Sequence, residues 1–260
     1  MAVAGETVEM EVDGRIAIVT IARPAARNAI DPETSRGLNE AFVAIEDDPE
    51  IWVSVITGAG DVFCAGADLK ALAAGRQLEI TGAEPWGFGG LVRQGRVKPV
   101  VAAVNGHALA GGLEVVLACD LVVAAEEAQF GLPEVSRGII AGAGGVWRLA
   151  QQIPYRRAME LILTGDRIDA AEALRLGLVN DVVARSDVLQ RALEVATRIC
   201  ENAPIAVRES RAIAAVAPGL PDADGWRLAE AAWETVLGSE DAKEGPRAFA
   251  ERRPPRWSGR

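Results

Sequence analysis

The chain alternates short apolar runs rich in β-branched residues with longer segments that repeat apolar residues at helical spacing. Residues 16–21 have the sequence Ile-Ala-Ile-Val-Thr-Ile, which is typical of a buried strand. A loop follows, and Asp31 and Pro32 then have the residue types that favour a helix N-cap and first helical position. Further strand–helix units begin with the apolar runs at 51–57 and 100–104. This repetition predicts an α/β protein with its strands and helices stacked around one core.

Composition excludes several classes of protein. Of the 260 residues, 50% are hydrophobic and 25% are charged, which excludes a disordered or fibrous chain and allows a sizeable core. The net charge of -10 argues against general electrostatic attraction to nucleic acid or to an anionic membrane. Any anionic ligand must therefore meet a local group of basic residues.

Cysteine and histidine limit the chemistry further. Cys64, Cys119 and Cys200 are far apart and form no CxxC pair, which argues against a disulfide framework or a zinc site and indicates a reducing compartment. His107 is the only histidine, so a multi-histidine metal site is excluded. The segment 1–14 has acidic residues and no long apolar stretch, unlike a signal peptide. We expect a cytoplasmic protein without a metal.

The last part of the chain has helical patterns. Asp169 and Glu172 have the spacing of a capping box, and Gly177 has the position of a helix C-cap. Residues 187–251 hold helical stretches interrupted by prolines, which indicates a helical subdomain.

The segment 73–96 has no clear pattern. It contains six glycines, with Trp86 and Phe88 among them. Two interpretations remain open: a long surface loop, or an adaptable apolar wall of a binding site.

Three glycine-rich segments are candidates for close backbone approach to a ligand. They comprise residues 64–69, residues 105–114, and residues 130–134 followed by Gly142-Ala143-Gly144-Gly145. None has the GxxxxGK[ST] or GxGxxG pattern, so ATP and NAD sites lack support.

The second of these segments has the residues for oxyanion chemistry. Gly111 and Gly112 lie at a predicted helix N-terminus, where free N–H groups favour a negative oxygen. Glu114 and Glu134 could divide general acid and general base work on one bound molecule. The alternative is that Glu114 only stabilises the helix terminus.

Several ordered motifs then resemble one family. They are CAGADLK at 64–70, KPVVAAVNGHALAGGLE at 98–114, AQFGLPE ending at Glu134, GAGG at 142–145 and LTGDRIDAAEALRLGLVN at 163–180. The chain resembles the crotonase (enoyl-CoA hydratase/isomerase) superfamily from Ile16 to about Arg252. The resemblance implies a ClpP/crotonase-like fold, with a spiral core of repeated ββα units and the acyl-CoA site in residues 1–195. It implies a helical trimerisation region in residues 196–260, giving homotrimers or hexamers built from two trimers.

The resemblance also implies residue roles. The backbone N–H groups of Ala67 and Gly111 match the oxyanion hole, and Glu114 and Glu134 match the two catalytic glutamates of the hydratases. The presence of both acids favours an enoyl-CoA hydratase, a hydro-lyase that adds water to trans-2-enoyl-CoA to give 3-hydroxyacyl-CoA, as in fatty-acid β-oxidation. The alternatives are an enoyl-CoA isomerase, a specialised acyl-CoA dehydratase, or a catalytically silent CoA-binding homologue. The CoA thioester is the substrate, and no cofactor, nucleic acid or membrane partner is expected.

Coenzyme A binding is expected, by the same resemblance, at a set of residues around the first glycine-rich segment and at one residue near the C-terminus. The set comprises Arg27, Ala65, Ala67, Asp68, Leu69, Lys70 and Arg252. Arg27 and Lys70 are candidate phosphate partners, with solvated surface charge as the alternative. Arg252 is expected to reach coenzyme A bound to a neighbouring subunit.

Three aromatic residues are candidates for the acyl pocket, namely Trp86, Phe88 and Trp147. Core packing is the competing interpretation for Trp147. His107, Asp68 and Asp120 are expected to have structural rather than catalytic roles.

Overall fold

The computed structural model describes residues 6–76, 87–93 and 95–260, so that Trp86 lies outside the described residues. The strands are β1 (Val8–Asp13), β2 (Ile16–Ile21), β3 (Val53–Gly58), β4 (Val62–Cys64), β5 (Val100–Val104), β6 (His107–Leu109), β7 (Leu121–Ala125), β8 (Gln129–Gly131), β9 (Arg167–Asp169) and β10 (Asp181–Val183). The α-helices are α1 (Pro32–Asp47), α2 (Leu69–Ala73), α3 (Gly111–Ala118), α4 (Gly145–Gln152), α5 (Tyr155–Thr164), α6 (Ala170–Leu176), α7 (Val188–Cys200), α8 (Pro204–Val216), α9 (Asp222–Leu237) and α10 (Glu240–Glu251). Short 3₁₀ helices are η1 (Pro24–Ala26), η2 (Phe88–Gly90), η3 (Pro133–Arg137) and η4 (Arg185–Asp187).

The strands form two sheets. The larger has the order β1-β2-β3-β5-β7-β10, and the smaller has the order β4-β6-β8-β9. Strands β2, β3, β5 and β7 pair in parallel, as expected when helical connections separate them. Strands β4, β6 and β8 also pair in parallel.

The chain repeats one unit of two strands and a helix. Strands β3 and β4 precede α2, strands β5 and β6 precede α3, and in each pair the first strand belongs to the larger sheet and the second to the smaller. The turn between the two strands therefore carries the chain from one sheet to the other. As a result, α2 and α3 both start at the smaller sheet, directly after β4 and β6.

Local sequence explains where helices start and stop. The side chain of Asp31 caps α1 by accepting a hydrogen bond from the N–H of Thr34, with Pro32 in the first helical position. Asp169 caps α6 in the same way, and Gly177 ends that helix in the left-handed conformation. The predicted caps Asp31, Asp169 and Gly177 are confirmed, whereas the carboxylate of Glu172, the second half of the expected capping box, accepts from Arg157 and Arg175 instead.

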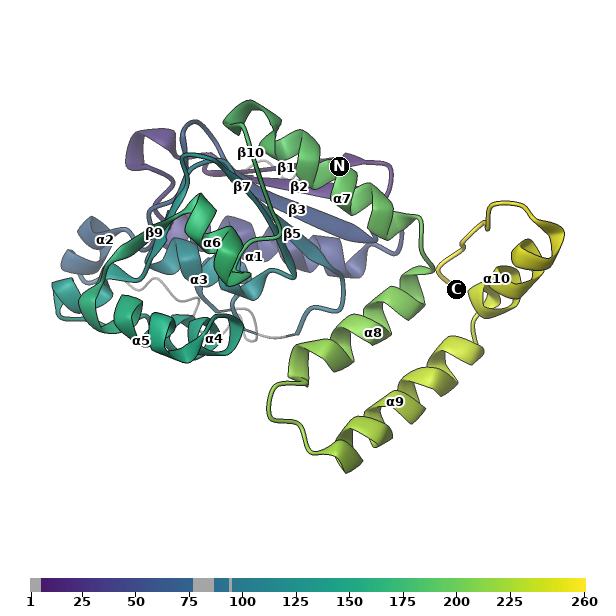
Figure 1. Ribbon diagram of the computed structural model, residues 1–260. Helices are drawn as coiled ribbons and strands as arrows, with labels where there is room; N and C mark the ends of the chain where they lie inside the picture. The colour runs from purple at the N-terminus through teal and green to yellow at the C-terminus, as the bar shows by residue number, and fades with distance from the viewer. Residues whose placement is uncertain (1–5, 77–86, 94) are drawn as a thin grey trace.

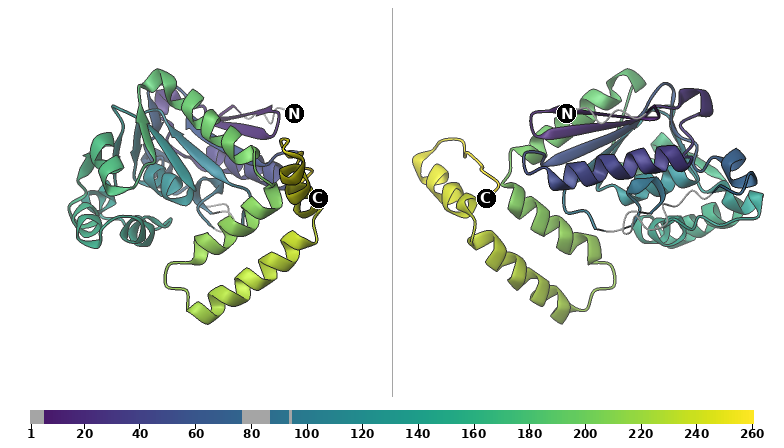
Figure 2. Two further views of the ribbon diagram at one scale, coloured as in Figure 1. Left: turned by 45° about the vertical axis from the view of Figure 1, so that its right-hand side comes forward. Right: turned by 180° about the vertical axis from the view of Figure 1, so that it is seen from behind.

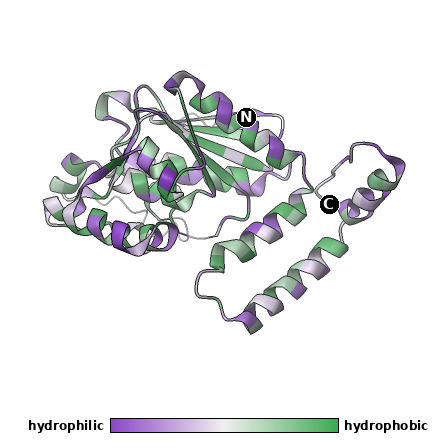
Figure 3. Ribbon diagram, viewed as in Figure 1, coloured by the Kyte–Doolittle hydropathy of each residue, from purple (hydrophilic) through white to green (hydrophobic). Residues whose placement is uncertain are grey.

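Helices cover both faces of the larger sheet. Figure 1 shows α7 on one face, with α1 and α3 on the other. Strands β3 and β5 are buried along their whole length, and Figure 3 shows the sheet as the most hydrophobic part of the ribbon. Parallel strands covered on both faces have continuous rather than alternating apolar sequences, as observed here.

The last three helices, α8 to α10, extend away from this body as an arm (Figures 1 and 2). Helix α7 packs on the larger sheet through its buried face of Val188, Ala192 and Ala196. The predicted domain boundary between residues 195 and 196 falls inside α7, and the chain leaves the body only after Cys200, where α7 ends.

Candidate active site

The start of α3 is fixed by a close approach of two backbone segments. Ala110, directly before the helix, has a φ of 53°, a conformation that is uncommon for a residue other than glycine. Gly66 has a φ of 96°, and a Cβ atom there would lie 2.7 Å from the Cβ of Ala110 and 2.9 Å from the nitrogen of Gly111. Only glycine fits at position 66, and the segment containing Ala67 therefore lies directly against the N-terminus of α3.

This approach places the two predicted oxyanion donors in one region. Ile30 forms a parallel bridge with Ala67, in which the N–H of Ile30 donates to Gly66 and its carbonyl accepts from Asp68. These bonds leave the N–H of Ala67 unused. In the described part of the chain, neither Ala67 nor Gly111 donates its N–H to another protein group. Two free backbone donors next to one another are suited to bind a negative oxygen.

Glu114 lies in the first turn of α3 and is only 4% exposed. Its Oε1 accepts a hydrogen bond from the backbone N–H of Gly145 at 2.9 Å. Burial raises the pKa of Glu114, while the amides of Gly145 and Ala143 and the positive charge of Arg148 act in the opposite direction. The carboxyl group is therefore buried but held in one orientation.

Glu134 lies in the first turn of η3 and is 6% exposed. Burial raises its pKa to about 7, a hydrogen bond from its own backbone lowers it, and the negative charge of Glu114 raises it further. Its Oε2 atom is buried and has no hydrogen-bond partner among the described residues. Both carboxyl groups are buried, and the free oxygen of Glu134 can accept or hold a proton.

Arg148 on α4 links the walls of this site. It donates from Nη2 to the carbonyl oxygen of Val92 and from Nη1 to that of Ala143 at 3.3 Å. Val92 follows η2, where the ring of Phe88 lies so close to Gly111 that a Cβ at position 111 would be 2.5 Å from Cε1 of the ring. Arg148 thus connects the segment that covers the oxyanion donors to the loop that holds Glu114. Apart from the position of Arg148 after GAGG, no sequence pattern indicates this role.

The predicted coenzyme A residues lie around the start of α2. Asp68 caps α2 by accepting hydrogen bonds from the N–H groups of Lys70 and Ala71, and it pairs with Arg23 at 3.3 Å. The N–H of Ala65 donates to the carbonyl of Arg27. The structural role expected for Asp68 fits these bonds.

Some of the predicted site residues lie together and others do not. Ala65 to Lys70 are continuous with the oxyanion donors, and the side chains of Arg27 and Lys70 are exposed. Arg252 directly follows α10, which lies at the end of the arm and far from α2 (Figures 1 and 2). Trp147 exposes 49% of its surface and lies against the guanidinium of Arg148, so the interpretation as a core residue is wrong.

The other potentially reactive groups have structural surroundings. Burial raises the pKa of the Cys64 and Cys119 thiols to about 12, and burial lowers that of His107. The three cysteines are unpaired. Within residues 6–76, 87–93 and 95–260, no three metal-binding side chains converge, and no helix has the length and apolar character needed to cross a bilayer.

The contact between Gly145 and Glu114 leads to a first prediction. Gly145→Ala would place a Cβ 2.7 Å from the Cβ of Ala141 and 3.0 Å from Oε1 of Glu114, so the carboxylate must move. We expect the free energy of unfolding, measured by urea denaturation, to fall by about 1–3 kcal/mol. Gly142→Ala is the matched control, because its new Cβ would have no neighbour closer than 3.7 Å. Equal stability of the two variants would contradict this account of Gly145.

The raised pKa of Glu134 leads to a second prediction. A carboxyl group whose pKa is raised on folding stabilises the fold below its unfolded value of 4.5, and this contribution is lost as the pH rises through about 7. Glu134→Gln removes the titration. Between pH 4 and pH 8 the free energy of unfolding of the variant should therefore rise by about 3 kcal/mol relative to that of the wild type.

Urea denaturation at each pH measures this difference. Glu9→Gln, at an exposed position of β1, is the control and should run parallel to the wild type. If the free energies of unfolding of Glu134→Gln and the wild type differ by a constant amount across this pH range, folding does not raise the pKa of Glu134, and this account is contradicted.

Comparison with known proteins agrees with this geometry. The model of the family described as "Enoyl-CoA hydratase/isomerase" matches residues 11–260. A carnitinyl-CoA dehydratase from Salmonella typhi is 43% identical over 98% of this chain and 99% of its own. The crystal structure of an enoyl-CoA hydratase from Mycobacterium tuberculosis H37Rv matches with a TM-score of 0.93 at 44% identity, covering 98% of this chain and 99% of that one.

A second solved structure, that of a carnitinyl-CoA hydratase from Mycobacterium avium, matches with a TM-score of 0.78 at 48% identity, covering 99% of this chain and 100% of that one. The predicted family and fold are thus confirmed. The chain belongs to the enoyl-CoA hydratase/isomerase family and has the crotonase fold.

Proposed function

We propose that this protein is an enoyl-CoA hydratase, which adds water reversibly to the 2,3 double bond of a trans-2-enoyl-CoA. The observation that carries this proposal is the pair of buried carboxyl groups: Glu114 lies in the first turn of α3, which begins at the free N–H of Gly111, and Glu134 lies in the first turn of η3. Family membership supports an acyl-CoA substrate and hydratase or dehydratase chemistry. Both carboxyl groups are needed for hydration, since one must accept a proton and the other must supply one.

The reaction follows from these groups. The thioester oxygen of the substrate accepts hydrogen bonds from Ala67 and Gly111, which stabilise the negative charge of the enolate. One carboxylate accepts a proton from water as the water oxygen bonds to C3. A carboxylic acid delivers a proton to C2 as the double bond is lost. The product is a 3-hydroxyacyl-CoA, and no covalent enzyme intermediate forms.

The electrostatics of the pair suit this exchange. A pKa of about 7 for Glu134 means that protonated and ionised forms are both populated near neutral pH. Because the two carboxyl groups interact, their titration belongs to the pair rather than to either residue. The hydrogen bond from Gly145 and the charge of Arg148 favour the ionised form of Glu114.

Coenzyme A would be held by the segment before α2. The exposed side chains of Arg27 and Lys70 flank this segment and offer positive charge to the phosphates of the ligand. They would supply a local basic region in a protein of net charge -10.

We propose that the arm mediates assembly into trimers or hexamers. Large apolar side chains are exposed on it, namely Trp226, Trp233, Leu237 and Phe249. Exposed aromatic residues of this size are typical of interfaces between subunits. Such an assembly would allow Arg252 to reach coenzyme A on a neighbouring subunit.

Dehydration of carnitinyl-CoA is a second candidate, favoured by the similarity to a carnitinyl-CoA dehydratase at 43% identity and to a carnitinyl-CoA hydratase at 48% identity. The carnitinyl group carries a hydroxyl on C3 and a trimethylammonium group on C4. Its dehydration is the same reaction run in reverse, so the two candidates differ only in the end of the acyl chain.

The two-carboxylate proposal predicts the effect of neutral replacements. Glu114→Gln and Glu134→Gln each remove one proton acceptor, and each should lower the kcat for hydration of crotonyl-CoA by roughly 10²–10⁴-fold. The loss of the conjugated-enone absorbance measures the rate. Glu9→Gln, exposed on β1, should keep the wild-type rate. Near-normal turnover in either active-site variant would remove that residue from the mechanism, and an inactive wild type would indicate a CoA-binding homologue.

A substrate comparison separates the two candidates. We expect crotonyl-CoA to be hydrated with a kcat/KM within about tenfold of that for the 2-enoyl-CoA bearing trimethylammonium on C4, because Glu114 and Glu134 act on C2 and C3 only. Turnover of the cationic substrate with crotonyl-CoA more than about 100-fold slower would instead identify a carnitinyl-CoA dehydratase. Isomerisation of a 3-enoyl-CoA without hydration would exclude both.

A further inference from the structure

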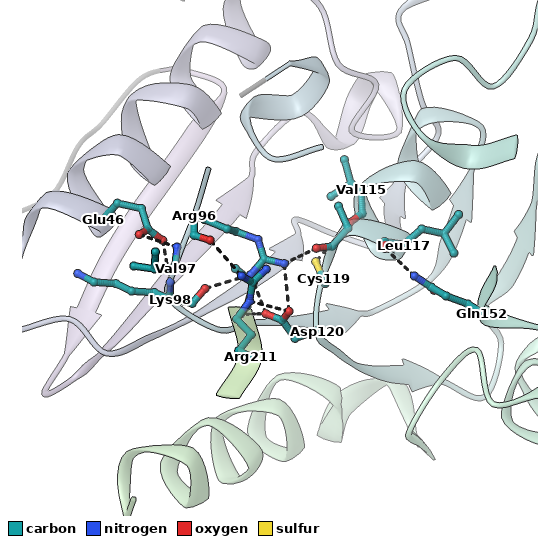
Figure 4. A network of polar contacts seen from close by, with 12 residues as sticks. Glu46, Arg96, Val97, Lys98, Val115, Leu117, Cys119, Asp120, Gln152 and Arg211 are labelled. Carbon is teal, nitrogen blue, oxygen red and sulfur yellow. Dashed lines mark hydrogen bonds and ion pairs between the residues drawn. The ribbon is translucent and has the colours of Figure 1, made fainter. Parts of the chain in front are cut away.

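A cavity lies at the opposite end of α3 from the predicted oxyanion donors. It has a volume of about 250 Å³. Its walls come from the end of α3, from α4 and from α8, and are formed by Arg96, Leu117, Ala118, Cys119, Asp120, Arg148, Gln151, Gln152, Arg211, Ala214, Ala215 and Pro218. Because α3 has eight residues, this cavity is roughly 12 Å along the helix from Gly111. Figure 4 shows its polar groups around Asp120.

Positive charge dominates this cavity. The described lining residues include three arginines, Arg96, Arg148 and Arg211, and a single carboxylate, Asp120. Asp120 is fully used, because it accepts from Arg96 at 2.7 Å, from Arg211 at 2.9 Å and from the N–H of Val100 at 2.8 Å. One negative charge therefore faces three positive ones.

The neighbouring acidic residues face other groups. Glu46 on α1 accepts from the N–H groups of Val97 and Lys98, as Figure 4 shows. Glu114 is held by the N–H of Gly145. Neither residue lines the cavity, although the charge of Glu46 acts on Arg211 and that of Glu114 acts on Arg148.

The carbonyl groups at the end of α3 are already paired. The carbonyl of Leu117 accepts from the side chain of Gln152, and that of Ala118 accepts from Arg96. The usual negative end of a helix is thus partly neutralised here.

Two of the three arginines keep donors for a ligand. Arg96 uses both terminal nitrogens, on the carbonyls of Lys98 and Ala118 and on Asp120. In Arg211, Nε and Nη1 are bonded, and Nη2 donates to no group among the described residues. In Arg148, Nη1 and Nη2 each have one bond, and Nε has none in the same part of the chain. Burial and the charge of Arg96 lower the pKa of both Arg148 and Arg211, and the negative charges of Glu114 on Arg148 and of Asp120 on Arg211 only partly oppose this shift.

We propose that this cavity binds a small oxyanion of the phosphate class between Arg148 and Arg211. A tetrahedral oxyanion has several acceptor oxygens, which match the planar donors of two guanidinium groups. The bound anion bridges α4 of the body to α8 of the arm, and therefore stabilises the position of the arm. This site is separate from the coenzyme A residues around α2.

Titration with inorganic phosphate tests the proposal. The free energy of unfolding of the whole protein is followed by urea denaturation at constant ionic strength, with sodium gluconate as the balancing salt. Specific binding gives a saturable increase from which a Kd is obtained, whereas a general salt effect gives a linear one.

Gln151→Glu and Arg211→Gln are the test variants. Gln151 is exposed and lines the cavity, so Gln151→Glu adds a carboxylate there without removing any arginine contact. This variant should be more stable than the wild type without phosphate, and should bind phosphate at least tenfold more weakly. Arg211→Gln should also weaken phosphate binding at least tenfold. Gln190→Glu, at an exposed position of α7, makes the same charge change elsewhere and should keep the wild-type Kd within twofold.

If phosphate bound at the coenzyme A residues instead, none of these changes would weaken its binding. A loss of phosphate affinity in the two test variants therefore locates the site in this cavity. The absence of saturable phosphate binding to the wild type would overturn the proposal. Unchanged binding in Gln151→Glu and Arg211→Gln would also overturn it.

Discussion

The close approach of backbone at the start of α3 is the constraint on which the rest of the site depends. A Cβ at Gly112 would lie 2.1 Å from the carbonyl oxygen of Cys64, and a Cβ at Gly66 would overlap Ala110. Glycine at these positions lets β4 and the N-terminus of α3 touch without side chains between them. Since the positions of the N–H groups of Ala67 and Gly111 follow from this contact, the predicted oxyanion donors are set by backbone packing and need no side chain to orient them.

The buried carboxyl groups oppose the stability of the same fold. Glu114 has a hydrogen bond from Gly145 to offset its burial, whereas Oε2 of Glu134 has no partner among the described residues. A buried polar atom without a partner costs free energy, and natural proteins tolerate this mainly where function requires the group to be available. Both residues are glutamates in a first helical turn, so the difference in their hydrogen bonding follows from their surroundings.

The sequence predicted what local chemistry determines. The strands near residues 16–21 and 100–104 and the caps at Asp31 and Asp169 depend on neighbours within a few positions, and the structure confirms them. The contacts of Arg148 with Val92 and of Gly145 with Glu114 join positions 56 and 31 residues apart, so no pattern of neighbouring residues predicts them. The core-packing interpretation of Trp147 was wrong for the same reason: its exposure depends on how α4 is oriented, which is decided by packing with distant elements.

Helix α3 connects the candidate active site to the arginine-lined cavity. Its N-terminus carries the oxyanion donor and Glu114, and Asp120, two residues beyond its last residue, pairs with Arg96 of the body and with Arg211 of the arm. Buried ion pairs add little net stability, because desolvation offsets their attraction, but they penalise arrangements in which a charge loses its partner. Asp120 therefore defines the direction in which α8 leaves the body. Arg148 lines the cavity at this anchor and donates to the carbonyl of Ala143 in the loop that holds Glu114, so one side chain lies between the far end of α3 and the buried carboxyl group in its first turn.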